Sequence, residues 1–306
     1  MTTDVVPARA EGLPARGAFR SLSRFSWRHP WLKPFAQISL PLAAFVFVYV
    51  AALVALLVQG LWTTDSFTGK IVHSWNLDNF RALGDTPYPT IIGRTVGIAA
   101  AVTATCMAIA FPYAYFLVRV ASRRLRLALL VATLLPLWVS YLVRVYSWRL
   151  ILNQDGALNW TLERLGLPDV GIAFTNWAMW LVFTYIWLPF MVLPVYAALE
   201  RIPYSYLEAS ADLGGRGLTT LRRVILPLAI PGLAAGSIFT FSLTLGDFIA
   251  PTLVGGPGSQ LIGNAVYDNI GLANNAPFAA ALAAVPLGIM AVYLAVMKRL
   301  GAFEAL

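Results

Sequence analysis

The side chains of this sequence that could carry out chemistry are few, and they do not form a catalytic set. The two histidines, His29 and His73, lie outside the long apolar runs, and no pair of histidine or cysteine residues has the spacing of a metal site. The glycine-rich segment 255–259 lacks the lysine of a phosphate-binding loop. We therefore expect no enzymatic activity, no ATP hydrolysis, and no cofactor or metal bound by this chain.

One carboxylate, Asp247, lies within a long apolar run. A charged side chain in a membrane span costs roughly 2.5–3.5 kcal/mol, so such residues usually face a cavity or a partner. Asp247 could be a counter-ion for a cationic substrate, or it could pair structurally with Arg144, with Arg149 or with a partner subunit. Aromatic residues more often serve packing, but three could line a substrate path through cation–π contacts with an amine: Trp138, Tyr141 and Tyr185.

The longest charged segment in the second half of the chain is 200–227, where acidic, basic, small and glycine residues alternate. Pro203 favours the start of a helix, because its missing N–H group is not needed in the first turn. Ser205 and Glu208 have the spacing of a capping box, in which two side chains bind backbone N–H groups at the helix start. The segment therefore predicts a short helix that begins near Pro203.

Glycine residues end this predicted helix. Gly214 and Gly215 can adopt the positive φ that the C-terminus of a helix often requires. A second short helix is expected from Leu218, and the two would form a compact helix–turn–helix unit on the membrane surface. Small side chains on the first helix would let a partner approach closely: Ala209, Ser210 and Ala211.

The composition places these residues in a membrane protein. Hydrophobic residues make up 59% of the chain and charged residues only 12%, whereas soluble proteins have about 25% charged residues. A span needs about 20 apolar residues, and proline residues inside the apolar segments permit kinks. We expect an all-α polytopic protein in which six segments cross the membrane: 37–60, 91–118, 127–148, 175–199, 226–254 and 277–297.

Lysine and arginine residues gather on one side of the predicted spans. Sixteen lie in the N-terminal region, in two connections and after the last span, and six lie on the other side. Since positive residues favour the cytoplasm, both termini and the segment 200–227 are predicted to be cytoplasmic. Topology thus accounts for the net charge of +8, and no nucleic-acid partner is expected. Residues 1–36 are expected to form a largely disordered arm, and residues 37–306 the transmembrane domain.

The segment 200–227 resembles the EAA loop of binding-protein-dependent ABC importer permeases. Glu208-Ala209-Ser210 is followed by Gly214, and Leu226-Pro227 closes the segment. The sequence departs mildly from the family pattern at Ser210, where alanine is usual, and at Val224, where isoleucine is usual. The resemblance implies that this loop is the coupling helix that docks into a cleft of the ATPase subunit, with Glu208 and Gly214 as its key residues.

A second resemblance narrows the family. Six short runs look like parts of spermidine/putrescine-type permeases: 135–148, 151–152, 156–159, 246–251, 255–257 and 261–264. This resemblance implies a type I (MetI-like) permease core made by the last five helices, in the inner membrane of a bacterium. The implied partners are membrane lipids, a second permease subunit in a heterodimer, a dimer of ATPase subunits that bind ATP and Mg²⁺, and an extracytoplasmic solute-binding protein.

The function implied by these resemblances is ATP-driven import of polyamines or similar small amines. Permeases for other solutes share the same motifs, so an opine, γ-aminobutyrate or an aminophosphonate remains an alternative. A secondary transporter driven by an ion gradient would require pseudo-symmetric halves and pairs of intramembrane acids. The sequence has one such acid and no evident repeat, which favours the importer.

Overall fold

The computed structural model describes residues 32–65 and 67–299. The chain divides into two units, residues up to Ala55 and residues from Leu56, and each is considered by itself. The predicted arm 1–36 lies almost entirely outside the described residues. The described part of the first unit belongs to α2 (Leu32–Gln59), an apolar helix that contains Pro41 and agrees with the first predicted span.

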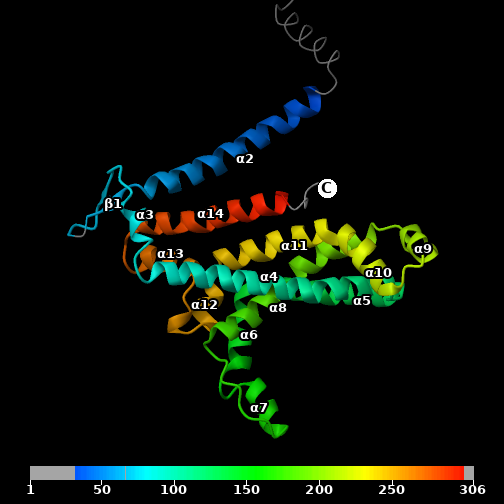
Figure 1. Ribbon diagram of the computed structural model, residues 1–306. Helices are drawn as coiled ribbons and strands as arrows, with labels where there is room; N and C mark the ends of the chain where they lie inside the picture. Colours follow the sequence, from blue (N-terminus) through cyan, green and yellow to red (C-terminus); the bar gives the residue numbers. More distant parts are fainter. Residues whose placement is uncertain (1–31, 66, 300–306) are drawn as a thin grey trace, which may run out of the picture. The chain divides into compact units, whose positions relative to one another are not determined.

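Four long helices organise the second unit: α4 (Tyr88–Arg119), α8 (Asn176–Glu200), α11 (Leu226–Gly246) and α14 (Ala276–Arg299). Figure 1 shows α8 lying along α4 and α11, and these three helices pack against one another. Their shared core consists of aliphatic, aromatic and small side chains, which suits close helix packing. The prediction of a mostly helical membrane protein is confirmed.

The predicted third span, 127–148, is not one continuous helix. The chain forms α5 (Arg123–Leu134), a 3₁₀ turn (Leu135–Trp138) and then α6 (Tyr141–Leu152). A bend of 96° separates the two helical parts. Pro136 lacks the N–H group that would continue the α-helix, and Val139 has an extended backbone with ψ of 138°. The described residues thus contain five helices able to span a membrane, or six if this bent pair forms one span.

The predicted fifth span, 226–254, begins and ends earlier than expected. The short helix α10 (Gly217–Thr220) continues into α11 through a π-helical turn (Leu221–Ile225), so the expected second surface helix is not separate. In this wider turn the N–H of Leu226 donates to the carbonyl of Leu221. We attribute the turn to Pro227, whose ring would clash with the preceding turn of a regular α-helix.

The fifth span ends at Gly246, and the chain breaks before α12 (Ile249–Val254). Asp247 occupies this break with an extended backbone, ψ 132°. A glycine followed by an extended residue interrupts the helical hydrogen bonds and leaves carbonyl groups of α11 free for other partners. The structure therefore places the intramembrane carboxylate at a helix break instead of within a continuous helix.

The short elements between the spans are β1 (Thr63–Thr64), β2 (Ile71–Val72), α3 (Asp78–Ala82), α7 (Ala157–Arg164), α13 (Ile262–Gly271) and a 3₁₀ turn (Pro257–Ser259). Figure 1 shows α3 beside the hairpin at one end of the long helices, whereas α7 lies beyond α6, away from the hairpin. In the hairpin loop the backbone N–H groups of Thr68 and Phe67 bind the Asp65 carboxylate and lower its pKa. The helix α9 (Tyr204–Asp212) lies at the opposite end of the second unit.

Candidate functional site

The helix α9 begins where the sequence predicted, with Pro203 as its N-cap, but no side chain binds the free N–H groups of the first turn. Ser205 is already inside the helix, so the capping box expected with Glu208 does not form. The Glu208 side chain is exposed and makes no hydrogen bond or ion pair with any residue that the structure describes. A carboxylate that the fold does not use is available to a partner.

The C-terminus of α9 confirms the predicted glycine stop at Gly214, whose φ is 79°. The N–H of Gly214 donates to the carbonyl of Ala211 at 2.8 Å, and the N–H of Gly215 donates to that of Ser210 at 2.8 Å. These two bonds form a Schellman motif, which requires a residue with left-handed φ. A Cβ at Gly215 would lie 2.5 Å from the Ser210 hydroxyl, so both glycine positions fix this turn.

The helix α9 is anchored to the transmembrane helices at both ends. The Arg119 guanidinium, at the end of α4, donates to the carbonyl of Ile202 at 2.9 Å. The Ser210 hydroxyl lies 2.9 Å from that of Thr220 in α10. Leu207 packs against the main core. A force on α9 would therefore reach α4 and the α10–α11 helix directly.

The outer face of α9 carries the predicted coupling residues. Glu208, Ala209 and Ala211 are exposed, as is Gly214, and the Leu213 side chain is 90% exposed. Beside this face lies a cavity of about 420 Å³ whose lining comes from α9, its C-terminal turn and the π-helical turn. A face with small residues, an exposed leucine and a neighbouring cavity is suited to contact with another protein.

A second set of functional residues meets at the α11–α12 break. The Asp247 carboxylate accepts a hydrogen bond from the N–H of Ala250 at 2.9 Å and another from the hydroxyl of Tyr141, which is 106 residues away in the sequence. It lines a cavity of about 320 Å³ together with Trp187, Phe248 and neighbouring residues. The arrangement places a negative charge beside an apolar and aromatic wall, as recognition of an organic cation requires.

The arginines that could have paired with Asp247 contact aromatic rings instead. The Arg144 guanidinium lies 5.8 Å from the centre of the Tyr141 ring, and that of Arg149 lies 5.7 Å from the centre of the Phe174 ring. Within residues 32–65 and 67–299, no ion pair involves Asp247. The carboxylate is thus held by neutral donors, and its negative charge is not cancelled by a neighbouring cation.

The aromatic residues predicted to line a path separate into different places. Tyr141 joins Asp247, whereas Trp138 is 90% exposed and Tyr185 packs edge-on against Trp148 with 5.3 Å between ring centres. Sequence reasoning missed Trp187 in α8, which stacks on Tyr141 at 5.8 Å and lines the cavity. In the sequence, Trp187 is one of several aromatic residues in the predicted span 175–199, and nothing else distinguishes it.

Two residues at the start of α13 hold the break in place. The amide group of Asn264, whose side chain is 7% exposed, donates to the carbonyl of Phe248 at 3.0 Å and to the Thr252 hydroxyl at 2.8 Å. Gly263 lies against the break so closely that a Cβ there would be 2.6 Å from the Asp247 carbonyl oxygen. The backbone of α13 therefore sets the position of the Asp247 backbone.

Replacing Gly263 with alanine should destabilise the protein by about 1–3 kcal/mol, because the added methyl group meets backbone atoms that cannot rotate away. Thermal unfolding of the purified permease in detergent would show a melting temperature lowered by a few degrees. Gly271→Ala, at the other end of the same helix, has open space around the new methyl group and is the matched control. Equal melting temperatures for the two variants would contradict the close approach of α13.

Among the described residues, no three histidine, cysteine, aspartate or glutamate side chains gather as a metal site would need. The polar groups at the two regions above are instead a carboxylate with neutral donors at the α11–α12 break and an exposed carboxylate on α9. These groups can bind a cation and a protein partner, respectively.

Comparison with known proteins places the chain in a family. Residues 110–301 match the family described as binding-protein-dependent transport system inner membrane component. The chain is 48% identical to the inner membrane ABC transporter permease protein YdcU of Escherichia coli (strain K12), over 96% of this chain and 97% of the relative. It is 32% identical to the spermidine/putrescine transport system permease protein PotB of the same organism, over 83% of this chain and 92% of the relative.

The fold also matches a solved transporter. A bacterial alginate ABC transporter in complex with an alginate pentasaccharide-bound periplasmic protein contains a chain that superposes with a TM-score of 0.69 at 18% identity, covering 89% of this chain and 96% of that one. The bent α5–α6 pair, the α9 turn and the interrupted fifth span thus belong to a chain with an importer permease fold. We conclude that the chain belongs to the binding-protein-dependent transport system inner membrane components, which are ABC transporter permeases and not enzymes.

Proposed function

We propose that this permease forms the translocation path for polyamines, such as spermidine and putrescine, or for similar small amines. The observation that carries the proposal is the Asp247 carboxylate at the α11–α12 break, which lines a cavity beside Trp187 and forms no ion pair with any residue in the described ranges. A protonated amine would receive a charge partner there and aromatic contacts beside it. The likeness to PotB, named for spermidine and putrescine, supports the same solute class.

The subunit works with three kinds of partner in this proposal. A second permease subunit completes the path as a heterodimer, a solute-binding protein delivers the amine, and an ATPase dimer supplies the energy. The alginate transporter bound to its periplasmic protein supports the second of these partners. The excess of positive residues on one side supports cytoplasmic termini and a cytoplasmic α9, where the ATPase would dock.

Coupling proceeds through the outer face of α9. The ATPase contacts Glu208, Ala209, Ser210, Ala211 and Gly214, and closure of the ATPase dimer pushes on this face. Because α9 is bonded to α4 through Arg119 and to α10 through Ser210, the push moves α4 and the α10–α11 helix. Such a movement would shift the α11–α12 break relative to its surroundings and open the path alternately to each side.

Another small amine or amino-acid-like solute is the alternative, since the name of the 48% identical relative specifies no solute. An opine, γ-aminobutyrate or an aminophosphonate also carries a protonated amine that Asp247 could bind. These solutes differ from polyamines because they carry an acidic group, which would need a cationic partner near the cavity. Arg144 is the nearest candidate on α6, because its guanidinium lies over the Tyr141 ring.

The proposal is tested with the complete transporter in liposomes, with its ATPase, second permease and binding protein. ATP-dependent uptake of radiolabelled spermidine and putrescine should exceed uptake of γ-aminobutyrate, an opine and an aminophosphonate by at least about tenfold, equivalent to about 1.4 kcal/mol. Uptake of one of the acidic solutes in preference to both polyamines would replace the proposed solute class with the alternative. ATP-independent uptake driven by an imposed ion gradient would contradict the importer mechanism.

A further inference from the structure

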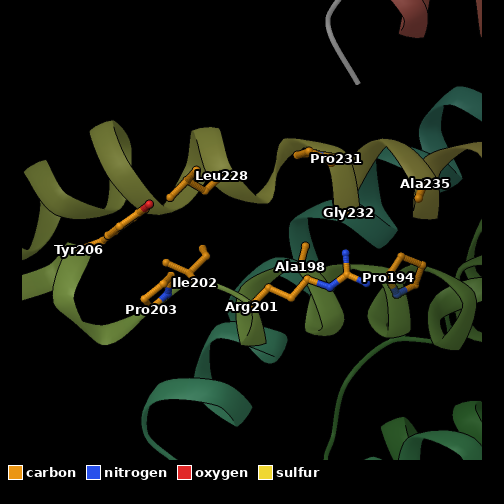
Figure 2. A pocket seen from close by; sticks show the side chains of 10 residues that line it. All are labelled: Pro194, Ala198, Arg201, Ile202, Pro203, Tyr206, Leu228, Pro231, Gly232 and Ala235. Carbon is orange, nitrogen blue, oxygen red and sulfur yellow. The ribbon is translucent and has the colours of Figure 1, made fainter. Parts of the chain in front are cut away.

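The helices α8 and α11 touch closely along the second half of α8, which leads into α9. A Cβ at Gly232 would lie 2.5 Å from the Cβ of Ala198, and one at Gly236 would lie 2.6 Å from the sulfur of Met191. A pocket of about 450 Å³ lies beside these contacts, with Ala198 and Gly232 in its lining, and extends to the α8–α9 connection. Figure 2 shows its walls, to which both helices and Tyr206 contribute.

The pocket is mostly apolar and carries one cation. Prolines, small and aliphatic residues and Tyr206 line it, and of the described residues around it Arg201 alone is charged. Figure 2 shows the Arg201 side chain extended along α8 toward Ala198 and Pro194. Its guanidinium makes no hydrogen bond or ion pair with any residue in the described ranges. A guanidinium in this setting favours an anionic ligand with an apolar part.

The neighbouring acid does not neutralise Arg201. The Glu200 carboxylate accepts a hydrogen bond from the Tyr196 hydroxyl at 2.8 Å and lies 3.8 Å from the Arg126 guanidinium. Tyr196 lies one turn earlier on α8, and Arg126 lies on α5. The exposed Arg201 therefore keeps its charge at the edge of the pocket.

The pocket extends along α8 into the part of this helix that spans the membrane. Pro194 and Arg201 both line it, and seven residues of α-helix correspond to about 10 Å along the axis. The pocket thus runs from the end of the membrane-spanning helix α8 to a point about 10 Å inside the span. This distance is comparable with the headgroup and upper acyl region of one leaflet.

We propose that this pocket binds an anionic phospholipid, with the phosphate on Arg201 and an acyl chain along the apolar walls. Basic pockets between membrane helices are a recognised way of holding acidic lipid headgroups. An acidic side chain of a soluble partner could reach Arg201, but it would leave the deep apolar walls uncovered. The lipid would lie beside the contact between α8 and α11, next to α9.

The test measures lipid binding by the intact transporter, whatever solute it carries. Phosphatidylglycerol would be titrated into the delipidated complex, with native mass spectrometry to determine bound lipid and phosphatidylcholine as the neutral probe. We expect selective retention of phosphatidylglycerol and about tenfold weaker binding in Arg201→Gln, since a charge-assisted hydrogen bond is lost. Arg222→Gln, an exposed arginine outside the pocket, is the matched control and should bind as the unmodified protein does.

A second variant tests the apolar space of the pocket without changing the charge of Arg201. Ala235→Phe would fill the pocket without removing Arg201 and should also reduce retention of phosphatidylglycerol. Equal retention of the two lipids by the unmodified complex, or unchanged retention in both pocket variants, would overturn the proposal. An Arg201→Gln variant that binds lipid normally but loses ATPase association would assign Arg201 to the soluble partner instead. Competition by inorganic phosphate without any need for the acyl chain would show an anion site and also overturn it.

Discussion

Replacing Glu208 with alanine should lower ATP-driven uptake by at least about tenfold while leaving the permease inserted and folded. The side chain is exposed and has no partner among the described residues, so its loss should change the free energy of unfolding by less than about 0.5 kcal/mol. Removing one partner of a buried charged contact between proteins costs about 2–5 kcal/mol. If Glu208 makes such a contact with the ATPase, the variant loses coupling and not stability.

The measurement compares uptake with ATP hydrolysis in the reconstituted transporter. Stimulation of ATP hydrolysis by the loaded binding protein should disappear in Glu208→Ala, and the complex should lose ATPase subunits during purification. Glu163→Ala is the matched control, because Glu163 is also an exposed glutamate and lies on α7, away from α9. Normal stimulation and normal uptake in Glu208→Ala would remove this residue from the coupling contact.

The parts of the fold that follow from local composition could be predicted from the sequence. Long apolar runs mark α2, α4, α8 and α14, because burial in lipid requires only length and apolar character. The end of α9 at Gly214 could also be predicted, because a residue with left-handed φ at the end of a helix is usually glycine. The predicted capping box with Glu208 does not form, because the N-cap is Pro203 and Ser205 therefore lies inside the first turn.

The irregular parts of the spans were not predictable from the same signals. Hydropathy averages over a window, so it reports neither the bend after Pro136 nor the break at Asp247. Proline indicates that a kink is permitted but not whether it becomes a 3₁₀ turn, as at Pro136, or a π turn, as before Pro227. The choice depends on packing with neighbouring helices.

For the residues of the candidate solute path, the sequence likewise indicated single residues but not the contacts between distant segments. Asp247 was recognisable as an isolated acid in an apolar run, but its bond to Tyr141 joins positions 106 residues apart. Trp187 became a candidate only because it stacks on Tyr141. Trp138 and Tyr185, equally reasonable from composition, lie away from this carboxylate's contacts. Contacts between distant segments thus decided which of the aromatic residues could share a site.

Replacing Asp247 with asparagine should raise the KM for a cationic solute by at least about tenfold. The amide oxygen can still accept from the N–H of Ala250, and the amide NH2 group can donate to the Tyr141 hydroxyl oxygen, so the geometry of the α11–α12 break is retained. What disappears is the negative charge that faces the cavity. A hydrogen bond to a charged group contributes about 1.5–3 kcal/mol, which corresponds to roughly tenfold or more in affinity.

The partner residue should show a smaller effect of the same kind. Tyr141→Phe keeps the ring that stacks on Trp187 but removes the hydroxyl that donates to Asp247. The carboxylate would then reorient, and we expect a several-fold rise in KM with folding preserved. Tyr185→Phe makes the same chemical change in a ring that packs against Trp148, and it should leave the kinetics unchanged.

A control variant tests whether the loss of a carboxylate matters at Asp247 in particular or at any turn of the protein. Asp65→Asn removes a carboxylate that also accepts backbone N–H bonds in a turn, but this turn lies in the exposed hairpin loop. Initial uptake rates as a function of solute concentration should show the KM increase for Asp247→Asn alone. The affinity of the binding protein for the solute should be unchanged, because the binding protein is a separate chain. Equal kinetics in the two variants would remove Asp247 from the path. A loss of transport at all concentrations, accompanied by a lower melting temperature, would instead show that the carboxylate stabilises the helix break. It would do so through the N–H of Ala250, in addition to the contacts that Gly263 and Asn264 of α13 make with the break.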